Sequence, residues 1–250
     1  MKIDDAMETI AKFFNDLIGA LVPGMVFAAG LGVEHIGPEG TMALVKAMDS
    51  TPLLLVALAM MFAMGYVLAA VFEASTTLRA KAAAHLPDRL RGRLPVAFCL
   101  PHGFDPADAE TRESYKDFRE IVKHARANSE PPAKGDVNWS YNDLRNVALS
   151  ASPEAAAVGR RFMFDSLLCR GVGTAMLLLA ADFTCCLIWT PRLLHPYSLA
   201  MNAAVQVALL ILVAMVLFNR GKEFYRRAMT TPFSIAVAEE RLKRASRSST

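Results

Sequence analysis

The sequence predicts an all-α polytopic membrane protein with four transmembrane helices and an α-helical cytoplasmic extension. Hydrophobic residues make up 54% of its 250 residues, charged residues make up 20%, and the mean hydropathy is +0.30. A typical soluble domain is less apolar, with about 45 to 50% apolar and about 25% charged residues. The apolar residues stand in long runs, and most Lys and Arg residues gather beside alternate ends of these runs.

Four apolar runs are long enough to form the membrane helices, because crossing the hydrocarbon takes about 20 residues. They are Leu17–Val33, Pro52–Phe72, Gly171–Thr190 and Tyr197–Phe218. The first run is the shortest and contains Pro23-Gly24, which we expect to act as a hinge that breaks or bends the helix. A cleaved signal peptide is the alternative for this run. The acidic residues that precede it outnumber the basic ones, which is the opposite of a signal peptide.

The positions of Lys and Arg predict the orientation. These residues gather in 73–170 and 219–250, whereas the short connections 34–51 and 191–196 contain only Lys46 and Arg192. The positive-inside rule then places the central segment, the tail and both termini in the cytoplasm, and we expect a multi-pass membrane protein. The basic residues can also contact anionic lipid headgroups. No basic stripe alternates with aromatic residues, so the composition gives no direct evidence for nucleic acid as a partner. A nucleotide or oligonucleotide ligand of the cytoplasmic part stays open as an alternative.

We expect five parts along the chain. They are an interfacial amphipathic helix (1–16), transmembrane helices 1 and 2 (17–72), a cytoplasmic helical region (73–170), transmembrane helices 3 and 4 (171–218), and a cytoplasmic C-terminal helix and tail (219–250). Ile3, Met7, Ile10 and Phe14 recur at helical spacing and predict the first part.

Helix signals continue through the central segment. The second membrane helix should extend to Leu86, Pro106–Ala127 should form an amphipathic helix, and Asn128–Asp136 should be a flexible linker. Ser140 and Asp143 have the spacing of a capping box, which predicts a short helix through Leu149.

Two further helices are expected to extend beyond the membrane. Pro153 begins a pattern that nothing interrupts until about Thr190, which gives a helix of roughly 55 Å, nearly twice the hydrocarbon thickness. The fourth membrane helix should extend to about Met229. Thr231-Pro232 should then start another helix to Ala245, followed by a disordered tail.

Asp182 is the candidate functional residue, because a central acid in a membrane helix usually faces other helices or water. Gln206 lies at matching depth in the fourth run, so we expect it to hydrogen-bond Asp182, with Asn202 and Thr184 extending a polar intramembrane patch. This patch has three interpretations. It is a structural bond between helices 3 and 4, a polar pore or ion pathway in an oligomer, or a proton or substrate relay.

Small residues in the first three runs predict close helix packing, and some of them predict a subunit interface. They include Gly24 in the first run, Gly65 in the second and Gly173 in the third.

The catalytic motifs of common enzyme classes are missing from the sequence, which has no P-loop, no HExxH and no GxSxG. Cys99-Leu-Pro-His102 lacks a second spaced pair of ligands, so it is a poor zinc motif. We therefore expect no enzyme, no metal site and no cofactor.

The segment Phe13–Gly24 (FFNDLIGALVPG) is followed by a second span, a helical insert and a terminal hairpin. In this it resembles small four-span bacterial inner-membrane proteins of the anti-phage defence effector type. The resemblance implies an oligomeric, channel-like effector that is gated by a cytoplasmic protein or nucleotide-type ligand. A membrane scaffold that recruits a soluble partner through 106–149 is the alternative, and a transporter is a third.

Overall fold

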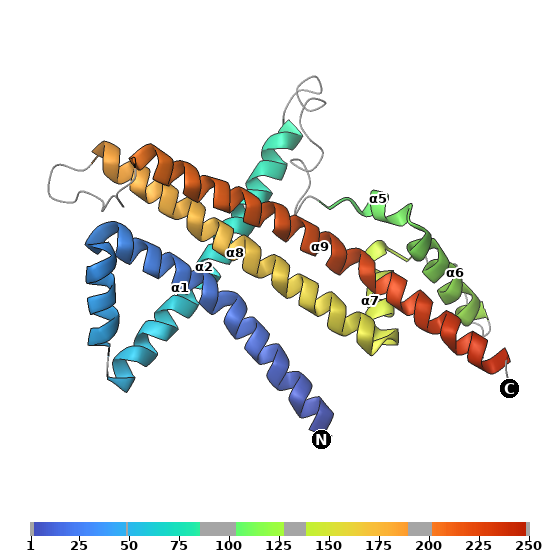
Figure 1. Cartoon of the computed structure of the whole chain (residues 1–250). Helices are drawn as coiled ribbons and strands as arrows, with labels where there is room; N and C mark the ends of the chain where they lie inside the picture. Colours follow the sequence, from blue (N-terminus) through green and yellow to red (C-terminus); the bar gives the residue numbers. More distant parts are fainter. Residues whose placement is uncertain (1–2, 49, 86–103, 128–138, 190–201, 249–250) are drawn as a thin grey trace. The chain divides into compact units, whose positions relative to one another are not determined.

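A computed structural model describes residues 3–48, 50–85, 104–127, 139–189 and 202–248 (Figure 1). Within these ranges all regular structure is helical. The helices are α1 (Ile3–Ala47), α2 (Thr51–His85), α5 (Pro106–Glu110), α6 (Glu113–Ala127), α7 (Tyr141–Ala151), α8 (Pro153–Trp189) and α9 (Ala203–Ser248). The prediction of an all-α chain is therefore confirmed. The expected linker 128–136 and the Cys99–His102 motif lie outside the described residues.

Four of these helices are long and apolar enough to cross a membrane, as predicted. Their candidate spans are Leu17–Ala47, Thr51–Arg79, Pro153–Ile188 and Ala203–Arg247. The chain divides into two compact units. The four-helix unit comprises 1–85 and 164–221, and the aromatic unit comprises 86–163 and 222–250. Both α8 and α9 contribute residues to each unit.

The bend in α1 lies at Gly37 and not at the predicted hinge. Pro23 and Gly24 keep helical backbone angles, whereas Gly37 has φ 76° and ψ 167°. A positive φ is open to glycine because it has no Cβ. Pro38 follows at the first position of the next helical turn, where its missing N–H has no intrahelical acceptor. The segment 38–47, predicted as part of a short connection, is thus a helix that turns away from the rest of α1 (Figure 1).

Gly24 instead allows α1 to pack closely on α2. A Cβ on Gly24 would overlap the carbonyl oxygen of Met61, and a Cβ on Gly65 would overlap the carbonyl oxygen of Ala20. On α1 the small residues Ala20 and Gly24 are four positions apart, and on α2 Gly65 lies four positions after Met61, which makes the contact through its backbone carbonyl. Small residues at a helix crossing let the backbones of membrane helices approach closely.

The four helices of the first unit alternate in direction. Ala20 and Gly24 meet Gly65 and Met61, so α1 and α2 are antiparallel. Along α8, by contrast, Phe164 lies against Gly19 and Leu179 lies against Gly30, so α1 and α8 are parallel. Gly173 contacts Phe218, and Ser166 Oγ donates a 2.7 Å hydrogen bond to the Gly221 carbonyl, so α8 and α9 are antiparallel. Alternating directions are what four successive membrane crossings require.

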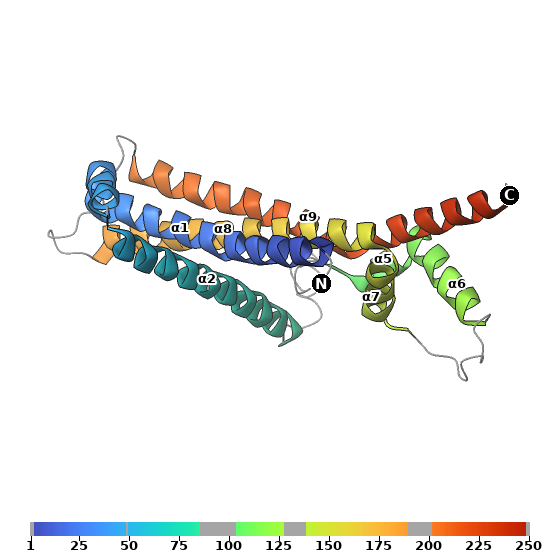
Figure 2. The same cartoon turned by 90° about the horizontal axis from the view of Figure 1, so that it is seen from below.

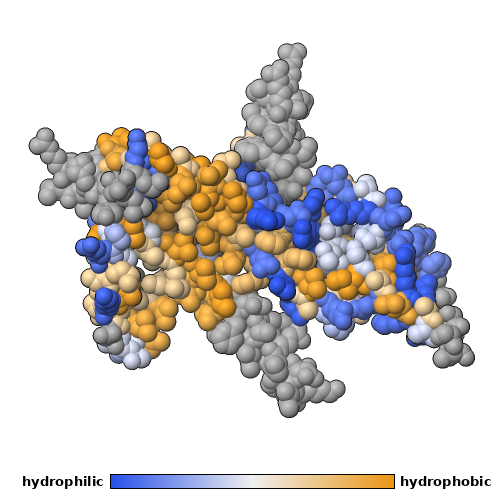
Figure 3. Space-filling view, viewed as in Figure 1, coloured by the Kyte–Doolittle hydropathy of each residue, from blue (hydrophilic) through white to orange (hydrophobic). Residues whose placement is uncertain are grey.

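The outer surface of the four-helix unit is apolar. In Figure 3 hydrophobic residues cover most of this unit, whereas hydrophilic residues gather over α5 to α7 and the C-terminal part of α9. Large hydrophobic side chains of α2 are widely exposed, among them Leu55 (61%) and Met60 (68%). A soluble monomer rarely exposes a contiguous apolar surface of this extent, which favours a lipid or protein environment for it.

An aromatic core holds the second unit together. Tyr115 stacks on Tyr141 with ring centroids 5.4 Å apart, and Phe233 of α9 meets both rings edge-on. The Ser140–Asp143 capping box is present, as predicted, and it opens α7. The single helix expected for 106–127 is interrupted at Thr111-Arg112, and α5 and α6 result. Figure 2 shows these short helices beside the C-terminal part of α9.

Pro232 does not begin a new helix, because α9 continues through it to Ser248. The prediction of a separate helix and a disordered tail is therefore wrong for residues up to 248. Pro232 has no N–H for the carbonyl of Ala228, four residues earlier. Arg145 Nε donates to that carbonyl at 3.3 Å, and Tyr141 Oη donates to the Met229 carbonyl at 3.0 Å. Arg145 of α7 thus supplies the donor that α9 lacks at its proline, and Tyr141 adds a bond to the next carbonyl.

Burial raises the pKa of Tyr141 and lowers the pKa of Arg145. The Tyr141 hydroxyl therefore keeps its proton at neutral pH and remains a donor. A guanidinium stays charged in proteins, so Arg145 also remains a donor.

Close packing at Gly24 predicts that Gly24→Ala and Gly65→Ala each destabilise the protein. Overpacking at a contact with backbone costs about 1 to 3 kcal/mol, since neither carbonyl can move aside easily. Thermal unfolding of the detergent-solubilised chain measures this loss. Gly19→Ala is the matched control on α1, because its Cβ would meet only the Phe164 ring at 3.3 Å. An equal loss in the control would contradict the packing argument.

The hydrogen bond from Arg145 to the Ala228 carbonyl predicts that substitutions of Arg145 and Pro232 have non-additive effects on the free energy of unfolding. Arg145→Met leaves the Ala228 carbonyl without its donor and should cost about 1 to 3 kcal/mol. In a Pro232→Ala background the restored N–H serves that carbonyl, so the cost of Arg145→Met should fall by about 1 kcal/mol. Denaturant unfolding can be followed by Trp139 fluorescence in a Trp189→Phe background, because these are the two tryptophans of the chain. Strictly additive costs would contradict this prediction.

Candidate functional site

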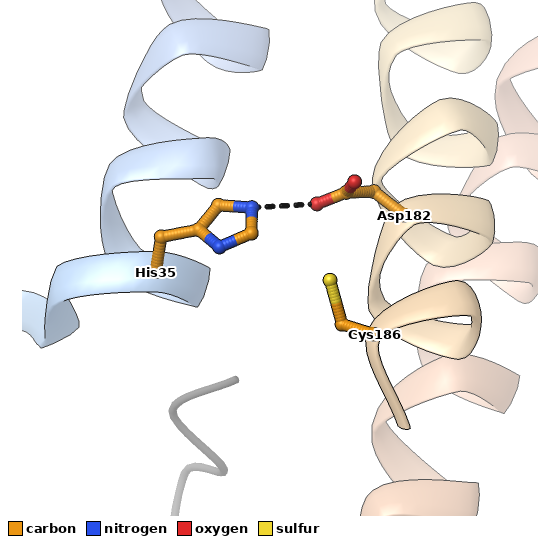
Figure 4. A group of neighbouring side chains, drawn as sticks. All are labelled: His35, Asp182 and Cys186. Carbon is orange, nitrogen blue, oxygen red and sulfur yellow. Dashed lines mark hydrogen bonds and ion pairs between the residues drawn. The ribbon is translucent and has the colours of Figure 1, made fainter. Parts of the chain in front are cut away.

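Asp182 pairs with His35 across the contact between α1 and α8. His35 Nε2 lies 2.8 Å from Asp182 Oδ2, and the two side chains point toward one another (Figure 4). The parallel packing of these helices brings the pair together, because Gly30 lies against Leu179 one to two turns earlier. The side chains are 35% and 37% exposed on the chain, so the pair is partly accessible.

Cys186 adds a third ligating group. It lies four residues after Asp182, which places both side chains on one face of α8. A ring nitrogen of His35, a carboxylate oxygen of Asp182 and the sulfur of Cys186 all lie within 4.8 Å of one another. Figure 4 shows the imidazole, the carboxylate and the sulfur converging on one region between the two helices.

Glu34 places a second carboxylate near this cluster. Its residue is only 4% exposed, and Oε2 has no hydrogen-bond partner among the described residues. Glu34 interacts electrostatically with Asp182 and with Cys186. Neither carboxylate forms an ion pair with a Lys or Arg of the described ranges. The cluster therefore combines two carboxylates and a thiol with a single imidazole.

The structure does not bring the other predicted patch residues to Asp182. Gln206 is buried at 7% exposure, and its Oε1 has no partner among the residues that the structure describes, so the predicted hydrogen bond to Asp182 is wrong. The Thr184 hydroxyl donates to the Ala180 carbonyl of its own helix at 2.7 Å. Asn202 Oδ1 accepts from the Ala204 N–H at 3.0 Å and caps the start of α9. These two polar groups serve their own helices.

Sequence reasoning missed His35 and Glu34 because it ended the first span at Val33. The apolar run stops there, so both residues were assigned to a connection. In the structure α1 remains helical up to the Gly37 bend, which carries His35 to the depth of Asp182. One signal in the sequence could have revealed them. Glu34 and His35 directly follow the first apolar run, and the helix-breaking pair Gly37-Pro38 comes only after them.

A second ionisable group is buried elsewhere in the four-helix unit. Arg170 of α8 is the last residue of the segment expected to be cytoplasmic (73–170), and it is 4% exposed. Its guanidinium carbon lies 5.3 Å from the centre of the Phe72 ring, and Phe72 stacks on Phe218 at 5.7 Å. A guanidinium over an aromatic face gains cation–π attraction, which is stronger when both groups are desolvated. Arg170 thus helps to join α2, α8 and α9.

A hydrogen-bonded imidazole and carboxylate can exchange a proton or hold a cation. These are the two chemical abilities of the cluster, since an imidazole can both donate and accept a proton and both groups are metal ligands. No family of proteins, no curated protein and no solved structure matches this chain.

Because Asp182 pairs with His35 and not with Gln206, substitutions of these two residues should affect stability differently. His35→Ala should destabilise the detergent-solubilised protein by about 0.6 to 2 kcal/mol, the usual range for a hydrogen bond between membrane helices. Gln206→Leu should leave stability unchanged or raise it, because the buried Oε1 has no partner to lose. Thermal unfolding of the two variants measures both effects. A larger loss for Gln206→Leu than for His35→Ala would restore the pairing expected from the sequence.

Proposed function

We propose that this chain is an oligomeric, ion-channel-like protein of the bacterial inner membrane. The observation that carries the proposal is the ionisable His35–Asp182 pair between two apolar helices. An acid at the centre of a membrane helix costs about 2.5 to 3.5 kcal/mol on insertion scales. Such residues mark ion and proton pathways when they meet water, which supports an ion pathway here.

The partial exposure of the pair supports an oligomer. More than a third of each side chain would face hydrocarbon if a single four-helix unit stood alone in lipid. Water in a shared pore, or the wall of a second subunit, removes that cost. The exposed apolar faces of α2 and α9 offer surface for contacts between subunits and with lipid.

The aromatic unit is the proposed sensor. The Lys and Arg distribution supports a cytoplasmic position for it and for both termini. It shares α8 and α9 with the four-helix unit, so a partner protein or nucleotide-type ligand that shifts these helices would act on the pathway. This arrangement accords with an anti-phage defence effector that depolarises the membrane when it is triggered.

A membrane scaffold is the second candidate, and one observation favours it. The aromatic unit contains an open pocket of about 410 Å³ lined mostly by apolar side chains, including Phe118, Trp139 and Val147, together with Glu240 and Lys243. An amphipathic helix of a soluble partner would fit such a surface. In this case the membrane helices serve only as an anchor.

The channel proposal predicts that Asp182→Asn changes ion flux. The amide oxygen still accepts a hydrogen bond from His35, so the helix contact survives while the charge is lost. We expect the flux of cations or protons from proteoliposomes to fall by about tenfold or more, equivalent to about 1.4 kcal/mol. Fluorescent ion and pH indicators inside the vesicles measure this flux.

Thr184→Val is the matched control on α8, because its hydroxyl bonds only within the helix. It should conduct like the natural chain. Equal flux from Asp182→Asn and the natural chain would overturn the pathway. No flux from the natural chain with or without its trigger would favour the scaffold.

A further inference from the structure

We infer that His35, Asp182 and Cys186 bind a divalent transition-metal ion of the Zn²⁺ class. The inference goes beyond the proposed function, because binding of a metal does not require that the protein conducts ions. The sequence gave no metal motif for these residues, because His35 lies 147 positions before Asp182.

The ligand set suits zinc better than magnesium or calcium. It offers one imidazole nitrogen, one carboxylate oxygen and one sulfur, and nitrogen and thiolate donors select Zn²⁺ and related ions over Mg²⁺ and Ca²⁺. Zinc sites with three protein ligands keep a fourth position open for water or a further group. Glu34 is buried near the cluster, and its carboxylate is a candidate for that further group.

The spacing of the donors is close to that of a zinc site. Bonds of about 2.0 to 2.3 Å in a tetrahedron separate neighbouring ligand atoms by roughly 3.3 to 3.8 Å. The three ligating atoms lie within 4.8 Å of one another, and the His35–Asp182 pair is at 2.8 Å. The ion would replace the hydrogen bond and widen that pair by about half an ångström, while the sulfur moves inward by a side-chain rotation.

Two helices hold the donors in place. Asp182 and Cys186 are one turn apart on α8, and His35 lies on α1 just before the Gly37 bend. Close packing of Leu179 on Gly30 fixes the distance between the helices beside the site. A site built on two packed helices needs only side-chain movement to bind.

The acidic groups of the cluster suit a cation. The carboxyl groups of Asp182 and Glu34 and the thiol of Cys186 lie near one imidazole, and the described residues provide no Lys or Arg ion pair for either carboxyl group. An acidic group held away from water either keeps its proton or coordinates a metal. A divalent cation would displace protons from these groups at the point where the donors converge.

Cobalt(II) titration of the purified full-length protein in detergent tests the inference. We expect one Co²⁺ per chain, visible-range bands of a tetrahedral site, a sulfur-to-cobalt charge-transfer band in the near ultraviolet, and displacement of these signals by Zn²⁺. Cys186→Ser should abolish the charge-transfer band. His35→Gln and Asp182→Asn should each weaken binding more than about 100-fold, beyond the roughly 10- to 100-fold expected for loss of a residue outside the coordination shell.

The chain provides its own controls, because it has three other cysteines. Cys185→Ser is the closest match, since Cys185 adjoins Cys186 but is not in the cluster. Cys185→Ser, Cys169→Ser and Cys99→Ser should keep the band and the affinity. Gel filtration and circular dichroism verify that each variant is folded.

Three results would overturn the inference. They are the absence of bound Co²⁺, a charge-transfer band that survives Cys186→Ser, and a band that is lost with Cys99→Ser instead. Ion flux is not a readout here, so failure of the channel proposal and failure of the metal site are distinguishable.

Discussion

The structure of the four-helix unit depends on the contact between α1 and α8. Parallel packing places His35 beside Asp182, and the 2.8 Å bond between them satisfies two polar groups between helices that are mostly apolar. The contact depends on glycine at position 30, because a side chain there would collide with Leu179 of α8. Glycines also allow the close packing of α1 on α2, at Gly24 and Gly65. Helices that gain nothing from burying apolar surface in lipid associate through such close approach and through a few hydrogen bonds.

The aromatic unit solves a related problem in another way. A proline within a long helix leaves a carbonyl without its donor, and an unsatisfied buried carbonyl costs about 1 to 3 kcal/mol. Arg145 and Tyr141 provide side-chain donors to the carbonyls before Pro232, and the Tyr141 ring also packs on Tyr115 and Phe233. One short helix therefore both completes the hydrogen bonding of α9 and forms the core. This explains why α9 can continue for 46 residues through a proline.

Composition and run length were sufficient to predict the four apolar helices, because the signal for each lies within about 20 neighbouring residues. Capping at Ser140 and the length of α8 were also local and were predicted well. Pro232 and Pro23 were misjudged, since their effect depends on donors and packing partners distant in sequence. Only one residue of the candidate pair was predicted from the sequence. Asp182 was identified from its cost in an apolar run, but its partner lay beyond the end of another run and became visible only when the Gly37 bend and the packing of α1 were known.

The partial exposure of the cluster connects the two proposals. His35 and Asp182 are more than a third exposed, whereas Glu34 beside them is buried. A cation would therefore reach the imidazole and the Asp182 carboxylate more readily than Glu34. If the exposed part of the cluster faces a pore shared by several chains, each chain contributes one such cluster to the pore wall. A bound divalent ion would then add positive charge to the pathway and oppose the passage of other cations, because like charges in a narrow, weakly polar pore repel strongly. Metal occupancy and conduction should therefore compete at the same residues.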